Sequence, residues 1–175
     1  QSQPQLPSCH KDGTDMKAKL EQLNFDVLYY TNTTRKTILE AISEFIKLAD
    51  CYSVLLVYYT GHGVQIDGEN YFVPIDCIYH PVKSVFIASS LVGVNTITQY
   101  MNEHEEKTNI LILDACRSSL SFFFVLGNIG LAEISAGNGT IIAFATSPNT
   151  SAFAPQTPDE NGYYTKRLLE HIDHP

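Results

Sequence analysis

The stretch VLLVYYTGHG, residues 54–63, runs from a continuous apolar segment into one histidine with a glycine on each side. A run of β-branched and aromatic residues without polar alternation is typical of a parallel strand that is covered on both faces. Ligands of such sheets bind at the carboxyl ends of the strands. The stretch therefore predicts a buried parallel strand, and it places His62 at the end of the strand where binding sites form.

Apolar runs and helical periodicities alternate along the rest of the chain. The apolar runs predict strands over residues 25–30, 54–59, 110–113 and 140–145, and an Asp-Gly pair at 67–68 predicts a β-hairpin. The periodicities predict helices from Asp12 or Thr14 onward, from residues 32–34 onward, over 94–101 and over 163–172. Residues 1–9 indicate a loop. The alternation predicts an α/β fold with a mainly parallel sheet, in a single domain that covers residues 1–175.

The composition excludes several classes of function. The formal net charge is −8 and no basic cluster is present, so we expect no nucleic-acid partner. No apolar run approaches the roughly 18 residues that a membrane span needs, and there is no signal-peptide pattern. The four cysteines lack metal-ligand spacing. We therefore expect no metal, no cofactor, no membrane association and a reducing, cytoplasmic location.

Two reactive side chains are predicted at the same edge of the sheet. His62 follows one core strand, and Cys116 follows another. A cysteine attacks as its thiolate, and a neighbouring imidazole can act as base and then as acid. Gly63 leaves space for a substrate backbone, and its N–H can donate to a developing oxyanion. The plainer interpretations are an inert core cysteine and a tight turn at Gly-His-Gly.

The segments YYTGHGVQIDGENYFVPID, residues 58–76, and NILILDACRSS, residues 109–119, resemble the caspase-like cysteine peptidases. The paracaspases are the most similar group and the metacaspases come next. The resemblance also takes in residues 9–27 and the segments GTIIAFATSPNTSAF and NGYYTKRLLEHI. It implies a three-layer sandwich in which helices flank a mainly parallel sheet. It also implies peptide-bond hydrolysis through a thioester, with His62 as general acid and base, Cys116 as nucleophile, and the amides of Gly63 and Cys116 as oxyanion hole.

The same resemblance implies a preference for basic residues before the scissile bond. True caspases usually carry Gln where this chain has Asp114, whereas paracaspases and metacaspases carry Asp there and cleave after Arg or Lys. A second family acid falls at Asp12. On the residues alone, Asp12 is also interpretable as a helix N-cap and Asp114 as a solvated strand end. A third acid of the paracaspases is replaced here by Ala154.

Other departures from the family favour an alternative function. The family's strand ahead of Cys9 is absent from this sequence, and so are the strand and helix that follow His171. The segment at 117–130 is unusually apolar. These features predict a homo- or heterodimer through a sheet edge, and they also fit a catalytically weak module that acts as a scaffold or regulator. Metacaspases often need calcium, but no EF-hand pattern is present. A flavodoxin-like domain is disfavoured because no glycine-rich phosphate loop follows a strand.

Overall fold

A computed structural model describes residues 6–80, 85–86, 88–115, 131–145, 155 and 157–173. Four α-helices occur in this part: α1 (Pro7–Gln22), α2 (Arg35–Ala49), α3 (Asn95–Glu103) and α4 (Tyr163–His171). The strands are β1 (Val54–Gly61), β2 (Gly63–Ile66), β3 (Glu69–Phe72), β4 (Tyr79–His80), β5 (Val85–Phe86), β6 (Val92–Gly93), β7 (Thr108–Ala115) and β8 (Thr140–Phe144), with a 3-10 helix at Ala88–Ser90.

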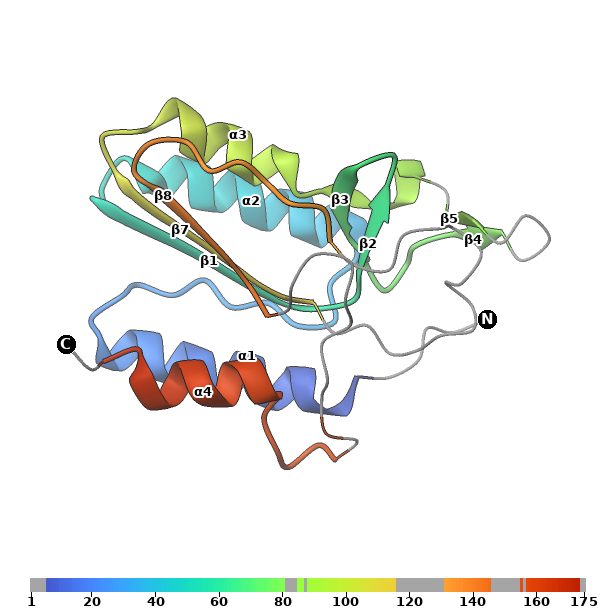
Figure 1. Cartoon of the computed structure of the whole chain (residues 1–175), viewed down its shortest axis with the longest axis horizontal. Coiled ribbons are helices and arrows are strands. Elements are labelled where there is room, and N and C mark those ends of the chain that lie inside the picture. Colours follow the sequence, from blue (N-terminus) through green and yellow to red (C-terminus); the bar gives the residue numbers. More distant parts are fainter. Residues whose placement is uncertain are drawn as a thin grey trace.

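A parallel sheet in the order β1-β7-β8 forms the central layer. Helices α1 and α4 lie along one face of it, and α2 and α3 cover the other (Figure 1). The antiparallel strands β2, β3 and β6 form a second sheet beyond the carboxyl end of β1. The predicted α/β class with a mainly parallel sheet between helical layers is therefore confirmed.

The two faces of the central sheet differ in chemistry. Alternate residues of a strand point to opposite faces, and partners in a parallel pair point to the same face. Leu111 and Leu113 pair with Val57 and Tyr59, and this face packs into the apolar core beneath α2 and α3. The opposite face carries Asp114 and the polar side chains of β1 toward α1 and α4. The sheet thus has one apolar face and one face that carries polar side chains.

Several predicted elements are confirmed. Helix α2 begins after Thr34, whose side chain accepts a hydrogen bond from the Thr37 N–H at 3.2 Å, as an N-cap residue does. The hairpin β2–β3 turns at Asp67 and Gly68, which both have positive φ, 51° and 84°. That geometry is the turn that Asp-Gly favours. The helices at 94–101 and 163–172 and the three core strands are also present.

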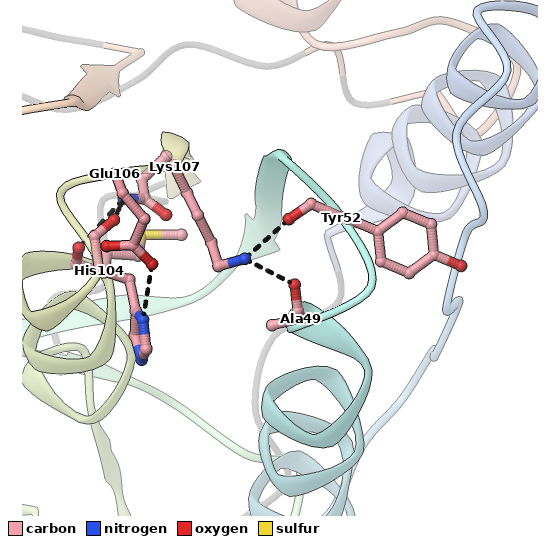
Figure 2. A network of polar contacts seen from close by, with 7 residues as sticks. Ala49, Tyr52, His104, Glu106 and Lys107 are labelled. Carbon is pink, nitrogen blue, oxygen red and sulfur yellow. Dashed lines mark hydrogen bonds and ion pairs between the residues drawn. The ribbon is translucent and has the colours of Figure 1, made fainter.

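Lys107, just before β7, forms hydrogen bonds with the end of α2 and with the loop that leads into β1 (Figure 2). Its Nζ donates to the carbonyl oxygens of Ala49 at 3.2 Å and Tyr52 at 2.9 Å. The last carbonyls of a helix have no partner within the helix, and a cation there also complements the helix dipole. Beside it, His104 Nδ1 lies 3.1 Å from a Glu106 carboxylate oxygen. These contacts lie at the amino ends of β1 and β7, at the opposite end of the strands from His62.

The predicted start of the first helix is wrong. Helix α1 begins at Pro7, not at Asp12, so residues 7–9 are helical and not a loop. Proline is compatible with the first turn because its missing N–H would be unpaired there in any case. Asp12 consequently lies inside α1, one and a half turns from its start, and it is not an N-cap. Residues 1–5 lie outside the described residues.

The predicted strand at 25–30 is also wrong: the segment has no regular secondary structure and forms no ladder with the other described residues. Side chains hold it in place. The Tyr52 hydroxyl donates to Asp26 at 2.5 Å, and the Tyr30 hydroxyl donates to Glu44 at 2.5 Å. Alternating apolar residues signal burial of one face but cannot supply a partner for the backbone. Within the described part of the chain, no helix is both long and apolar enough to cross a membrane.

Candidate functional site

The carboxyl ends of β1 and β7 meet at one edge of the central sheet. Gly61 pairs with Ala115, the last residue of β7, in the parallel register, and His62 directly follows Gly61. The structure thus brings His62 next to the end of the strand that precedes Cys116. Cys116 itself lies outside the described residues, as do the segment 117–130 and Ala154.

The backbone of His62 is held firmly at this edge. Its carbonyl oxygen accepts hydrogen bonds from the Val73 N–H at 3.0 Å and from the Tyr59 hydroxyl at 2.6 Å. The ring of Tyr59 packs against Phe72, with centroids 4.3 Å apart, and burial raises the pKa of its hydroxyl, which stays a neutral donor. His62 is 9% exposed. The imidazole is therefore presented from a rigid turn between two strands.

The glycines beside His62 have a packing reason. A Cβ on Gly63 would lie 3.0 Å from the Ala115 Cβ and 3.2 Å from Leu131, closer than nine in ten real contacts of a Cβ. A Cβ on Gly61 would lie 2.8 Å from the Tyr59 hydroxyl. Gly63 thus lets β2 approach the end of β7 closely, and Gly61 leaves room for the Tyr59 side chain. Packing alone explains both glycines, and the space for a substrate backbone stays a prediction.

Asp12 and Asp114 converge although 102 positions separate them (114 − 12). Asp12 comes from α1 and Asp114 from the penultimate position of β7. The point where a Cβ would stand on Gly162 lies 3.1 Å from Asp12 Oδ2 and 3.6 Å from Asp114 Oδ2. Two carboxylates from different layers therefore border the same small space, on the polar face of the sheet and at its carboxyl edge.

The Asp12 carboxyl is fully buried and incompletely paired. Its Oδ1 accepts the Gly162 N–H at 2.8 Å, whereas Oδ2 has no hydrogen-bond partner among the described residues. Ser8 and Asn161 face the carboxyl closely enough to lower its pKa, but their buried Oγ and Nδ2 atoms form no hydrogen bond of good geometry within the part of the chain that the structure describes. Burial is the largest effect and, with the nearby Asp114 charge, raises the pKa of Asp12 to about 6.

Asp114 is 2% exposed, so its interpretation as a solvated strand end is wrong. The Thr165 hydroxyl donates to its Oδ2 at 2.6 Å, and the Tyr58 hydroxyl lies 2.5 Å from that same Thr165 oxygen. Burial raises the pKa of Asp114, and the bonds from Thr165 lower it in part. Two buried acids with raised pKa values at the carboxyl edge of a parallel sheet are a combination found at functional sites.

Comparison with known proteins decides the family. A family model described as the caspase domain matches residues 1–175. The chain belongs to the caspase domain family. This confirms the resemblance to caspase-like cysteine peptidases, the paracaspases among them. A caspase domain with two buried acids and a histidine at one sheet edge is consistent with a peptidase site.

Two curated proteins are similar to this caspase domain over nearly its whole length. The mucosa-associated lymphoid tissue lymphoma translocation protein 1 homolog of Mus musculus is 27% identical over 170 residues. The protein of that name from Homo sapiens is also 27% identical over 170 residues. In both cases the match covers 97% of this chain but 20% of the relative. The chain therefore spans about a fifth of the length of the curated relatives it matches.

The described residues of the caspase domain contain no group of three or more histidine, cysteine or acidic side chains that could hold a metal ion. Cys9, expected in a loop, lies in α1, where its sulfur accepts a hydrogen bond from the Thr60 hydroxyl at 3.2 Å. Thr60 pairs with Asp114 across the sheet. A second thiol therefore lies on the polar face of the sheet, near the acids.

Sequence reasoning missed the residues that hold the two acids. Gly162, Thr165 and Tyr58 had no assigned function, because none belongs to a spacing pattern that indicates a site. Thr165 occupies the first turn of an amphipathic helix and is fully buried there. A polar residue on the buried face of a helix needs a partner, which is the one signal that the sequence offered.

Asp12→Asn is expected to stabilise the fold at neutral and higher pH. The folded-state pKa of Asp12, about 6, lies above its ordinary value of 3.8, so the fold prefers the protonated form. The cost of ionising it is absent below about pH 4, grows between about pH 4 and 6, and reaches at most about 3 kcal/mol above that. Asparagine has the same shape and can still accept the Gly162 N–H.

Urea unfolding of the two proteins at pH 4 and pH 8 measures this effect. We expect equal free energies of unfolding at pH 4 and a more stable Asn variant at pH 8. A variant that is less stable at pH 8 would show that the Asp12 charge is paired in the native protein.

Proposed function

We propose that this caspase domain is a cysteine endopeptidase that cleaves peptide bonds after Arg and, less well, after Lys. Cys116 is the nucleophile, and His62 is the general acid and base. The amides of Gly63 and Cys116 receive the oxyanion, and Asp12 and Asp114 bind the basic side chain. The caspase domain match supports the peptidase class, and the convergence of Asp12 and Asp114 carries the proposed specificity.

The two acids suit a guanidinium. A guanidinium presents five donors in a planar fork and can bind two carboxylates at once, whereas an ammonium is a compact point charge. Asp12 Oδ2 has no partner among the described residues, so a ligand donor can satisfy it. An acidic substrate side chain would meet two buried carboxyl groups. The charge arrangement therefore favours Arg over Lys and disfavours Asp.

The proposed reaction follows from the chemistry of a Cys–His pair. The Cys116 thiolate attacks the carbonyl carbon after the basic residue, and the carbonyl oxygen gains the negative charge. His62 gives a proton to the leaving amine as the thioester forms. It then takes a proton from water, which hydrolyses the thioester and frees the thiolate. His62 lies beside Ala115, the residue before Cys116, and this position supports the roles proposed for Cys116 as nucleophile and His62 as general acid and base.

Covalent labelling tests the proposal. A peptide chloromethyl ketone with Arg as its last residue is incubated with the protein, and the alkylated residue is mapped by mass spectrometry. We expect one modified site, Cys116, and no labelling by the matched probe that ends in Asp. Labelling of Cys9, Cys51 or Cys77, or equal labelling by the Asp probe, would contradict the proposal.

Pairing of two chains along a sheet edge is part of the same proposal. Within the described residues β8 is bonded only to β7, and Ile141 on it is 59% exposed. An unpaired strand edge can template association. Light scattering over a range of concentrations measures this, and a constant monomer mass would contradict it.

A further inference from the structure

We infer that Thr165 and Tyr58 are positioning residues that orient Asp114 and hold it in its charged form, so that they set the recognition of a cationic side chain. The inference rests on the proposed cleavage after basic residues. It concerns a chain of three polar groups from three elements: Tyr58 on β1, Thr165 on α4 and Asp114 on β7.

The direction of the hydrogen bonds follows from counting protons. A threonine hydroxyl has one proton, and the Thr165 proton is directed to Asp114 Oδ2 at 2.6 Å. In the 2.5 Å contact between Tyr58 and Thr165, Tyr58 must therefore be the donor. Both hydroxyls then point toward the carboxylate. Aligned hydrogen bonds of this kind polarise one another, so each strengthens the next.

The first turn of α4 holds both acids at once. Gly162, the N-cap of α4, donates its N–H to Asp12, and Thr165 three residues later donates to Asp114. One helical turn therefore fixes the separation of the two carboxylates. Loss of the Thr165 hydroxyl is expected to displace Asp114. This displacement should weaken the binding of a guanidinium by both carboxylates more than it weakens the binding of a single positive charge.

The surroundings of Asp114 explain why the hydroxyls of Thr165 and Tyr58 affect its pKa. Among the described residues, Asp12 on α1, Tyr58 on β1 and Tyr164 on α4 are titratable groups that face Asp114. Burial raises the pKa of Asp114, and the Thr165 bonds oppose that shift. Burial also raises the pKa of Tyr58, which keeps its proton for donation. Removing the Thr165 hydroxyl is expected to raise the pKa of Asp114 further.

The test compares Thr165→Val, which keeps the shape and removes the hydroxyl, with Thr165→Ser, which keeps the hydroxyl. The kcat/KM of an Arg peptide substrate is measured from pH 5 to pH 9. We expect Thr165→Val to lose about tenfold or more at pH 7 and to shift the acidic limb of the profile to higher pH. Thr165→Ser should restore both, and Tyr58→Phe should shift the limb in the same direction by less.

Two further measurements separate the possible failures. Carboxyl carbon NMR of the unliganded variants follows the titration of Asp114 without any turnover, and Tyr58→Phe probes the chain while leaving α4 unchanged. An unshifted titration in both variants would overturn the inference. If instead Asp114→Asn leaves the Arg preference intact, the proposed function has failed. If Asp114→Asn abolishes the Arg preference but Thr165→Val and Tyr58→Phe shift nothing, only the inference has failed.

Discussion

Turnover of an Arg peptide substrate is expected to disappear in Cys116→Ala and to fall by about 10²- to 10⁴-fold in His62→Ala, the usual contribution of a general acid and base. Alanine cannot form a thioester, so loss of Cys116 removes the reaction path itself. Loss of the imidazole leaves the thiol without a group that removes its proton and returns it to the leaving amine. Initial rates under saturating substrate measure both effects.

Control variants at another cysteine and another histidine show whether the loss of turnover is specific to Cys116 and His62. Cys51 and His10 are both exposed, and Cys51 precedes β1, at the opposite end of that strand from His62. Cys51→Ala and His10→Ala should therefore keep full turnover. The unfolding midpoints of all four variants should remain close to that of the parent protein. An active Cys116→Ala variant would show that another residue is the nucleophile.

Asp114→Asn is expected to reduce kcat/KM for Arg substrates by roughly 30-fold to several thousand-fold. The basis is the 2–5 kcal/mol that is typically lost when one partner of a desolvated charge pair is removed. Asparagine keeps the shape of the side chain, and its oxygen can still accept the Thr165 proton. The stability of the fold should therefore change far less than activity does.

Asp67→Asn is the control for charge alone. Asp67 is exposed in the β2–β3 turn with positive φ, a conformation that asparagine tolerates. The net charge changes equally in both variants, so a general electrostatic effect would appear in both. If Asp67→Asn reduces Arg cleavage as much as Asp114→Asn does, the specificity assigned to Asp114 is wrong.

The sequence predicted the three central strands but placed the ends of two of them too early. The apolar runs end at Tyr59 and Leu113, whereas β1 and β7 continue to Gly61 and Ala115. The ladder continues through a polar pair, Thr60 and Asp114, which hydrophobic periodicity does not detect. This extension places Asp114 on the polar face of the sheet. The alternation rule predicted the fold class because it depends on long apolar runs, not on their ends.

Local patterns were least informative at Asp12. An acid followed by an amphipathic segment is the usual signature of a helix N-cap, but α1 starts five residues earlier at a proline. A buried acid inside a helix is unfavourable on its own and is tolerated where another element supplies a donor, here the Gly162 N–H. Contacts between residues 150 positions apart leave no trace in the spacing of a single sequence.

Cleavage preference tests the central claim most directly. A positional-scanning peptide library, in which each residue is placed in turn immediately before the scissile bond, is digested and the rates are compared. Two converging acids at Asp12 and Asp114 predict the fastest cleavage after Arg, slower cleavage after Lys and none detectable after Asp. Preference for Asp, or equal rates whatever the charge, would contradict the assignment of these two carboxylates to substrate binding.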